Sequence, residues 1–349
     1  MKVKAICVRI ASNMRLSVSN RFNPNTNYEE RMIIAVCGAG AAGSYAVKRL
    51  RLNLPEAGIL LFDAAPVGFY AKMRLPEYLA GTLPREKLIL SSPEQMADWG
   101  VELHLGETVT AIDPASHKLT TVVGEYSWDI LVLAVGAHAF LPPIPGLQSS
   151  SRVHVLRELP DADALVSLCT PGLDAAVIGG GLLGLEAAWS LHKRGLSVSI
   201  IETAPRLLPL QMNEEESAAL LSNFTNAGFK VFTGAAVERF DEASAHLFLK
   251  DGVAVPASFV LVSAGIRANL ELAKNAGLVC NRGIVVDAAL RASAPDVYAI
   301  GDCAELNGAV TGLWLASKDQ GEAVADIIAG KIDAMPAKTY RPKPKLPAF

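Results

Sequence analysis

Two stretches of the chain share one order of apolar and polar positions. Residues 32–50 read MIIAVCGAGAAGSYAVKRL: a short apolar run, a glycine loop, and then apolar residues at helical spacing. Residues 174–202 read DAAVIGGGLLGLEAAWSLHKRGLSVSIIE and repeat this order. A short apolar run bounded by glycine predicts a buried strand, and the spacing that follows predicts a helix. We therefore expect two strand-loop-helix units of parallel sheets, far apart in one chain.

Two further apolar runs in the chain also predict strands. Residues 128–146 read WDILVLAVGAHAFLPPIPG, a strand pattern that meets a glycine turn and a proline-rich crossing. Residues 283–305 read GIVVDAALRASAPDVYAIGDCAE and end an apolar strand in Gly301 and Asp302. A helical pattern follows and is expected to start near Thr311 and Gly312. The pattern predicts an α/β fold.

The first glycine loop has the chemistry of a dinucleotide cradle. Gly38, Gly40 and Gly43 stand in G-x-G-x-x-G spacing. The first glycine permits the tight turn, the second lets backbone approach a pyrophosphate, and the third packs helix on strand. About 20 residues later Asp63 ends the next apolar run and is placed to accept from a ribose hydroxyl. Free N–H groups at the helix N-terminus would bind the phosphates.

The second loop repeats this arrangement with Gly179, Gly181 and Gly184. Glu202 closes its second strand, about 18 residues after the last glycine. A carboxylate there pairs with the ribose 2′-hydroxyl of NAD and repels the extra phosphate of NADP. Arg206 stands nearby, so NADP(H) remains the less favoured alternative. One chain thus carries two predicted dinucleotide sites.

Composition narrows the class of partner. The chain has 349 residues, 51% of them apolar, and a formal charge of -3, which does not favour nucleic acid or an anionic membrane surface. No apolar run reaches the roughly 18 residues that span a bilayer. The cysteines are far apart and form no C-x-x-C pair, which argues against a disulfide framework and a cysteine metal site. They are Cys7, Cys37, Cys169, Cys280 and Cys303. We expect a reducing, cytoplasmic location and no metal.

With these motifs in order from Met32 to about Gly330, the sequence resembles the two-dinucleotide flavoprotein branch of the pyridine nucleotide-disulfide oxidoreductase superfamily. It is most similar to NADH:rubredoxin reductases and to the flavin portion of NADH-dependent nitrite reductases. The motifs include LVLAVGAHAFLPPIPG, LVSAGIRANLELAKNAG and YAIGDCAE. The resemblance implies two Rossmann-like, doubly wound, three-layer domains, with an NAD domain inserted into an FAD domain.

The expected domain limits follow. The FAD domain spans residues 32–152 and 283–332, and the NAD(H) domain spans 153–282. Residues 1–31 are a leader, a tail or a mis-assigned start, with Met32 favoured as the initiator. Residues 333–349 form a proline- and lysine-rich tail where relatives usually continue into a third domain, so the interface domain is expected to be absent and the oligomer is left open.

The cofactor residues come from the loops and from the resemblance. For FAD they are Gly38, Gly40, Ala41, Ala42, Gly43, Asp63, Lys72, Ala134, Gly136, Gly301, Asp302, Gly312 and Leu313. For NAD they are Gly179, Gly181, Leu182, Leu183, Gly184, Glu186, Glu202 and Gly265.

The segment GFYAKMRLP, residues 68–76, distinguishes branches of the superfamily. The classical disulfide reductases carry two cysteines in this region and the peroxidase-like relatives one, and this chain has neither. The segment instead resembles the Tyr-x-Lys/Arg-x-x-Leu pattern of the rubredoxin and nitrite reductase branch, with Tyr70, Lys72 and Leu75 in register. There the base lies at the flavin, where a cation stabilises the anionic reduced ring. The alternative is that Lys72 is a solvated lysine on a helix face with no role at the flavin.

Glu186 resembles the glutamate that family members place beside the nicotinamide. A buried carboxylate needs a partner, so a Lys72–Glu186 ion pair is the hypothesis for both catalytic side chains. The helix near Thr311 is expected to point its N-terminus at the flavin, with Lys318 and Gln320 as contacts of the ring.

These observations predict an FAD-dependent NADH:acceptor oxidoreductase. Hydride would pass from NADH to flavin, and electrons onward to rubredoxin, another iron or iron–sulfur protein, or a small oxidant. The alternatives are an NADH oxidase or diaphorase that uses oxygen or quinone, and a non-catalytic NADH-sensing flavoprotein.

Overall fold

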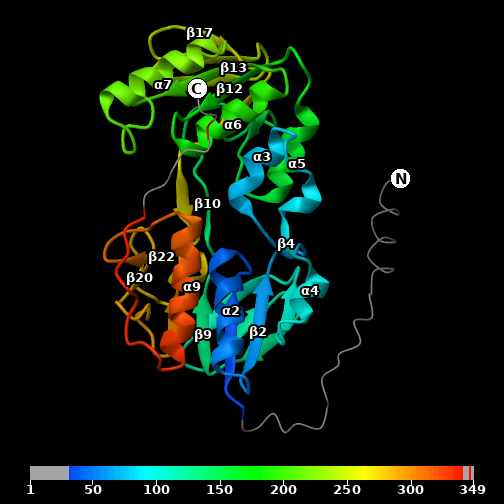
Figure 1. Cartoon of the computed structure of the whole chain (residues 1–349), viewed down its shortest axis with the longest axis vertical. Coiled ribbons are helices and arrows are strands. Elements are labelled where there is room, and N and C mark those ends of the chain that lie inside the picture. Colours follow the sequence, from blue (N-terminus) through cyan, green and yellow to red (C-terminus); the bar gives the residue numbers. More distant parts are fainter. Residues whose placement is uncertain (1–30, 341–345, 347–349) are drawn as a thin grey trace, which may run out of the picture. The chain divides into compact units, whose positions relative to one another are not determined.

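Two parallel five-stranded sheets form the centre of the fold (Figure 1). The computed structural model describes residues 31–340 and residue 346, so residues 1–30 and most of the end of the expected tail lie outside the described residues. The first sheet has the order β21 (Val297–Ala299), β9 (Ile130–Leu133), β1 (Ile33–Cys37), β2 (Gly58–Asp63) and β5 (Glu102–Leu105). The second has the order β11 (Val153–His154), β18 (Phe259–Val262), β12 (Asp174–Ile178), β13 (Ser197–Glu202) and β14 (Lys230–Thr233).

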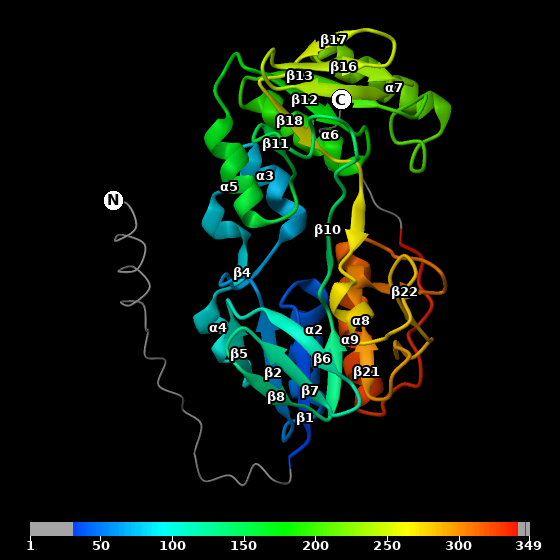
Figure 2. The ribbon, with the colours of Figure 1, turned by 180° about the vertical axis from the view of Figure 1, so that it is seen from behind.

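The chain leaves the first sheet after β9 and returns to it with β21, so the second sheet is an insertion. The exit and the return pair as an antiparallel ladder of β10 (Ala137–Ala139) and β19 (Ile266–Ala268), visible in Figure 2. The α/β class with two Rossmann-like units is therefore confirmed. The buried strands β1 and β12 are almost wholly apolar, as strands covered on both faces must be.

Helices cover the two sheets. They are α2 (Ala41–Asn53), α3 (Leu75–Leu79), α4 (Pro93–Ala97), α5 (Leu159–Leu168), α6 (Leu182–Lys193), α7 (Glu214–Asn226), α8 (Glu271–Asn275) and α9 (Trp314–Ile328). Helices α2 and α9 lie side by side, and a Cβ added at Gly321 would meet the carbonyl oxygen of Ala42 at 2.2 Å, so the helices approach closely. Helix α9 begins at Trp314, two to three residues after the expected start near Thr311 and Gly312, because Gly312 has a left-handed φ of +64° just before it.

Short strands and 3-10 turns complete the two units. Two three-stranded antiparallel sheets comprise β6 (Val109–Asp113), β7 (Lys118–Thr121) and β8 (Glu125–Ser127), and β15 (Val237–Asp241), β16 (His246–Leu249) and β17 (Ala254–Pro256). Two further pairs are β3 (Phe69–Tyr70) with β4 (Ile89–Ser91), and β20 (Ile284–Val286) with β22 (Ala304–Leu306). The 3-10 turns are η2 (Lys72–Arg74), η3 (Arg85–Leu88) and η4 (Gly301–Cys303).

The two glycine loops have nearly the same geometry. Gly38 has a φ of +112° and donates to the carbonyl of Phe62 at 2.7 Å; Gly179 has a φ of +117° and donates to the carbonyl of Ile201 at 2.8 Å. A Cβ on Gly43 would lie 1.8 Å from the carbonyl oxygen of Gly38. The third glycine therefore lets the helix pack on the loop, as expected from the spacing.

One segment within the predicted 32–152 range packs with the second sheet. Leu75 and Leu79 on α3 are buried in the same apolar cluster as Leu159 of α5 and Leu185 of α6. Figure 2 shows α3 beside α5. Phe69 is buried in the core of the first sheet, whereas Leu75 and Leu79 are buried in that of the second, so residues 69–91 connect two cores that the predicted domain limits treat as separate.

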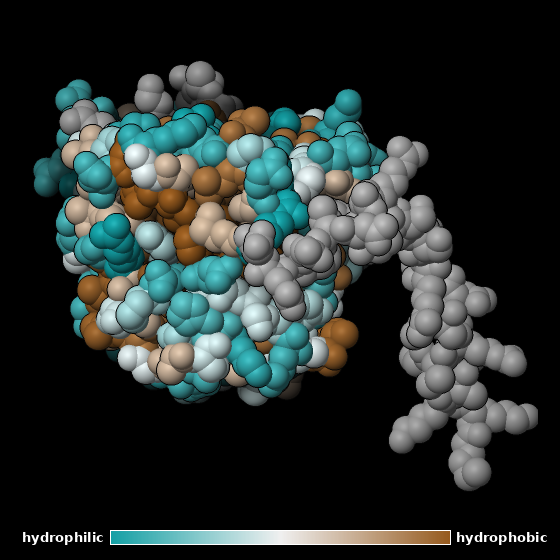
Figure 3. All heavy atoms as spheres, turned by 90° about the horizontal axis from the view of Figure 1, so that it is seen from below, coloured by the Kyte–Doolittle hydropathy of each residue, from teal (hydrophilic) through white to brown (hydrophobic). Residues whose placement is uncertain are grey.

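The surface is chemically mixed. In Figure 3 hydrophilic residues cover much of the face that is shown, while hydrophobic residues gather in one patch and also stand singly around it. Scattered apolar residues of this kind are normal on protein surfaces. Within the described part of the chain, no helix has both the length and the apolarity needed to cross a membrane.

Candidate functional site

A cavity of about 970 Å³ opens where β1, β2 and β9 end. In doubly wound folds, ligands bind outside the carboxyl ends of the strands, and this volume is at the upper end of the range for small-molecule sites. The lining includes eleven of the thirteen residues expected at FAD: Gly38, Gly40, Ala41, Ala42, Asp63, Lys72, Ala134, Gly136, Gly301, Asp302 and Gly312. Gly43 and Leu313 are not in it. The structure thus brings together residues spread over the whole first sheet unit.

The loop at Gly40 has the form of a phosphate cradle. A Cβ added at Gly40 would meet no atom within 4 Å, so the backbone is open toward the cavity. Helix α2 starts at the next residue with no side-chain cap and no acidic residue in its first turn. Its first N–H groups have no partners within the helix, and together with the helix dipole they suit a pyrophosphate. These residues fit a bound dinucleotide.

Asp63 lies at one side of the cavity and fixes the loop. Its Oδ2 accepts from the backbone N–H of Ala39 at 2.6 Å, and its Oδ1 accepts from Ala65 at 2.8 Å. Burial raises the pKa of Asp63 above the ordinary value, and the two backbone N–H groups oppose that shift. The carboxylate thus lies beside the cradle, as the spacing predicts.

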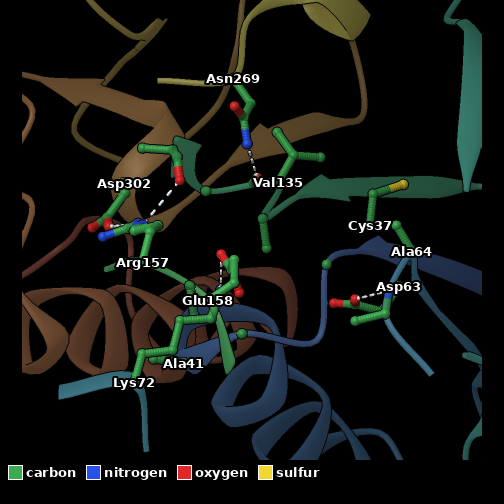
Figure 4. Close-up of a pocket in the computed structure, with 18 of the residues that line it drawn as sticks. Cys37, Ala41, Asp63, Ala64, Lys72, Val135, Arg157, Glu158, Asn269 and Asp302 are labelled. Carbon is green, nitrogen blue, oxygen red and sulfur yellow. Dashed lines mark hydrogen bonds and ion pairs between the residues drawn. The ribbon is translucent and has the colours of Figure 1, made fainter. Parts of the chain in front are cut away.

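Arg157 is a cavity residue that the sequence did not reveal. Its Nη2 lies 2.7 Å from Oδ2 of Asp302, and its Nε donates to the carbonyl of Ala137 at 3.0 Å. Ser317 donates to the other oxygen of Asp302 at 3.2 Å. Figure 4 shows Arg157 and Asp302 together on the side of the cavity opposite Asp63. Nothing in the local pattern around Arg157 indicates this pair, because the two residues lie 145 positions apart.

Lys72 enters the cavity with a partner other than the expected one. Its Nζ lies 2.6 Å from Oε1 of Glu158, and Oε2 of Glu158 accepts from the Tyr70 hydroxyl at 2.6 Å. The Lys72–Glu186 pairing is therefore wrong: Glu186 lies on α6 and lines a smaller pocket with Pro76 and Trp189. Glu158 directly precedes α5, and α5 packs against the segment that carries Lys72. This packing places the Glu158 carboxylate next to the Lys72 ammonium.

The Lys72–Glu158 pair is half-exposed, with side-chain exposures of 30% and 43%. Ion pairs this accessible contribute about 0.2–1 kcal/mol to stability. Burial and then the Glu158 carboxylate raise the pKa of the Tyr70 hydroxyl, so Tyr70 stays protonated and donates to Glu158. The Lys72–Glu158–Tyr70 cluster in the cavity wall therefore contributes little to the stability of the fold.

The residues expected from α9 are placed differently. The Oε1 of Gln320 accepts from the buried N–H of Gly301 at 2.6 Å, and Lys318 lies 3.3 Å from Glu322. Neither side chain lines the cavity. Trp314, the first residue of the helix, does line it and stacks on Phe69 with centroids 5.6 Å apart. The helix therefore meets the cavity with an aromatic ring.

The second glycine loop lies mostly outside this cavity. Of the residues expected at NAD, Leu183 alone belongs to its lining. Gly181 is open in the same way as Gly40, and Leu182 starts α6 after it, again without a side-chain cap. Gly184 repeats the packing of Gly43, with a Cβ position 2.0 Å from the Gly179 carbonyl oxygen.

Glu202 repeats the role of Asp63 at the second loop. It accepts from the N–H of Gly180 at 2.6 Å and from that of Ala204 at 2.7 Å. Arg206 donates to the carbonyls of Met212 and Pro209, so its guanidinium is engaged with its own loop. Gly265, directly before β19, has a φ of +97°. The second cradle is therefore formed by the same kinds of contacts as the first.

The cysteines in the described part of the chain are free thiols. Burial raises the pKa of Cys37 to about 12 and that of Cys303 to about 11, so both stay protonated near neutral pH. A protonated thiol is a poor nucleophile. Cys7 lies outside the described residues. Among those described, no three or more His, Cys, Asp or Glu side chains cluster to hold a metal ion.

Known proteins share this organisation. The chain is 32% identical over 317 residues to the assimilatory nitrate reductase electron transfer subunit of Bacillus subtilis, covering 90% of this chain and 40% of that protein. It spans 33% to 40% of that relative and of two nitrite reductases. It is also 32% identical to the rubredoxin-NAD(+) reductase of Alcanivorax borkumensis, covering 85% of this chain and 79% of that one.

A solved structure and a family profile agree with these relatives. The NADH:rubredoxin oxidoreductase of Clostridium acetobutylicum superimposes with a TM-score of 0.77 and 25% identity, covering 91% of this chain and 79% of that one. The profile of the pyridine nucleotide-disulphide oxidoreductases matches residues 32–322. Members of this family use FAD and NAD(H). The chain therefore belongs to the pyridine nucleotide-disulphide oxidoreductase family.

Proposed function

We propose that this protein is an FAD-dependent NADH oxidoreductase that passes electrons to a small redox protein of the rubredoxin class. The observation that carries the proposal is the large cavity, which joins an open glycine cradle, a ribose-type carboxylate and a lysine cation in one lining. Bound flavin would supply hydride acceptance from the nicotinamide and single-electron release to the acceptor.

The chain's own residues would hold the cofactor along the cavity. The α2 N-terminus at Ala41 and the backbone at Gly40 bind the pyrophosphate. Asp63 accepts from the adenosine ribose, while Arg157 and Asp302 hold the polar chain toward the opposite side. Lys72 supplies a cation that stabilises negative charge on the ring. Trp314 excludes water from the helix side.

The second cradle would hold NADH. Gly181 and the start of α6 bind its pyrophosphate, and Glu202 selects the 2′-hydroxyl over a 2′-phosphate. The engagement of Arg206 with two carbonyls supports NAD over NADP, because a guanidinium held by its own loop is not directed at a phosphate.

In this proposal no cysteine carries electrons from the flavin to the acceptor. Cys37 lines the cavity, but its buried thiol is protonated, and the Lys72 segment carries no cysteine. The acceptor must therefore take electrons directly from the cofactor. Two relatives are named for electron transfer or for rubredoxin reduction, which supports a protein acceptor.

The test uses the purified full chain. We expect a flavin absorption spectrum that NADH bleaches within a stopped-flow trace and that oxidised rubredoxin restores rapidly. Rapid restoration by air alone would instead support an oxidase, and a long-lived NADH-reduced complex would support a sensor. A colourless protein that does not take up added FAD would refute the proposal.

A further inference from the structure

We propose that Glu158 is a positioning residue that holds Lys72 in the cavity and sets the effective charge of this wall. The inference rests on the proposed function for its redox consequence, but the contact itself is independent of any cofactor. Glu158, Lys72 and Tyr70 all line the cavity, and the three form one connected cluster.

The cluster fixes both oxygens of Glu158. Oε1 lies 2.6 Å from the Lys72 ammonium and Oε2 lies 2.6 Å from the Tyr70 hydroxyl. The Tyr70 oxygen in turn accepts from the backbone N–H of Leu159 at 3.2 Å. Tyr70 is buried, so the carboxylate is oriented by a rigid donor as well as by the flexible lysine. An oriented carboxylate restricts where the ammonium can lie.

The backbone of Glu158 is also held. Oδ2 of Asp161 accepts from the N–H groups of Glu158 at 2.7 Å and of Arg157 at 3.0 Å, at the start of α5. Helix α5 packs in the core of the second sheet, whereas Lys72 lies on the segment that leaves the first. The second unit thus determines the position of a cation in the cavity of the first.

The charge of the wall follows from this pairing. Arg157 is compensated by Asp302, and Lys72 by Glu158, so the two cations of this side each have an anion. Asp63, Glu107 and Glu271 are further carboxylates of the lining. Replacing Glu158 by glutamine keeps an acceptor for Tyr70 but leaves the Lys72 charge uncompensated. An uncompensated cation stabilises added negative charge nearby.

The decisive measurement is the midpoint potential of the bound flavin, obtained by spectrophotometric redox titration. We expect Glu158→Gln to shift the potential in the positive direction and Lys72→Gln to shift it in the negative direction. Because Glu158 acts through Lys72, Glu158→Gln introduced into the Lys72→Gln protein should give a clearly smaller shift than in the wild type.

Asp163 offers a matched control on the same helix. Its carboxylate accepts from the Tyr78 hydroxyl at 2.8 Å and from Arg85 at 2.9 Å, so it also joins α5 to the 69–91 segment through a tyrosine and a basic side chain. It does not line the cavity. Asp163→Asn should leave the potential unchanged. An unchanged potential in Glu158→Gln, or the same shift in both variants, would overturn the proposal.

A second readout needs no flavin. The rate at which acetic anhydride acetylates Lys72, followed by mass spectrometry of the apoprotein, should rise in Glu158→Gln and stay constant in Asp163→Asn. If the wild type binds no flavin, the proposed function is wrong, but the acetylation rate still tests whether Glu158 holds Lys72. An unaltered acetylation rate in Glu158→Gln would show that Glu158 does not hold Lys72.

Discussion

The guanidinium of Arg157 lies 2.7 Å from the carboxylate of Asp302, although 145 residues separate them. Arg157 comes just before the first helix of the inserted unit, and Asp302 follows the last strand of the first sheet. Their side chains are mostly shielded, with exposures of 21% and 14%. The pair therefore connects the insertion to the sheet that it interrupts, inside the wall of the cavity.

Replacing Arg157 by alanine should weaken FAD binding by about tenfold or more, or about 1.4 kcal/mol. The reason is that the cavity would lose the Arg157 guanidinium, and Asp302 would lose the hydrogen-bond donor that orients its carboxylate. Fluorescence titration of the apoprotein with FAD measures the effect. Arg49→Ala is the control, since it breaks an equally short ion pair with Asp326 away from the cavity. Equal affinity in the two variants would contradict the assignment.

The second and third glycines of the first loop, Gly40 and Gly43, should respond differently to alanine. Gly40→Ala adds a methyl group in open space, so the protein should keep its melting temperature and lose FAD affinity. Gly43→Ala forces a methyl group into the Gly38 carbonyl, and the free energy of unfolding should fall by about 1–3 kcal/mol or more. Thermal unfolding together with FAD titration separates the outcomes. Unchanged FAD affinity in Gly40→Ala would count against the cradle.

Glu202→Gln should reduce the preference for NADH over NADPH by about tenfold, equivalent to about 1.4 kcal/mol. The carboxylate repels a 2′-phosphate and accepts from the 2′-hydroxyl, while the neutral amide does neither as well. The ratio of kcat/KM for the two nucleotides measures the change. Glu215→Gln on the exposed face of α7 is the control and should leave the ratio as it is. If Glu202→Gln leaves this ratio unchanged, residues other than Glu202 determine the preference for NADH over NADPH.

His104 should make stability depend on pH. Burial by itself lowers the pKa of His104, but hydrogen bonds to Glu102 and Glu107 outweigh it and raise the pKa above the ordinary 6.5. A raised pKa in the folded state gives a stabilisation that is complete below the unfolded value and is lost as pH rises through the folded value. The melting temperature of wild type relative to His104→Gln should therefore fall as pH increases above about 6.5.

The control for this prediction is His246→Gln. His246 is partly exposed at the start of β16, the central strand of a small sheet, and the contact of its Nδ1 is with the carbonyl of Ser244 rather than a carboxylate. The melting temperature of wild type relative to His246→Gln should not fall with rising pH in this way. A wild-type advantage over His104→Gln that is the same from pH 5 to pH 9 would show that the carboxylates do not hold a charged imidazole.

Local patterns were sufficient for the elements that depend on neighbouring residues. The apolar run, the glycine spacing and the following helical pattern around Gly38 predicted a strand, a loop and a helix, and the structure contains all three, because turn geometry and helix starts are set within a few positions. The same holds for the loop at Gly179. The start of α9 lies two to three residues after the predicted start near Thr311 and Gly312, because Gly312 has a left-handed φ just before the helix.

The sequence by itself determined that the chain contains two dinucleotide cradles, that its first acid lies beside the first cradle, and that the Lys72 segment lacks a thiol. Only the tertiary structure decided which side chains face one another across the units: Lys72 with Glu158, and Arg157 with Asp302. Periodicity reports which face of an element is buried but not which distant element covers it. The Lys72–Glu158 pair depends on the packing of α3 against α5, and no local pattern encodes that contact.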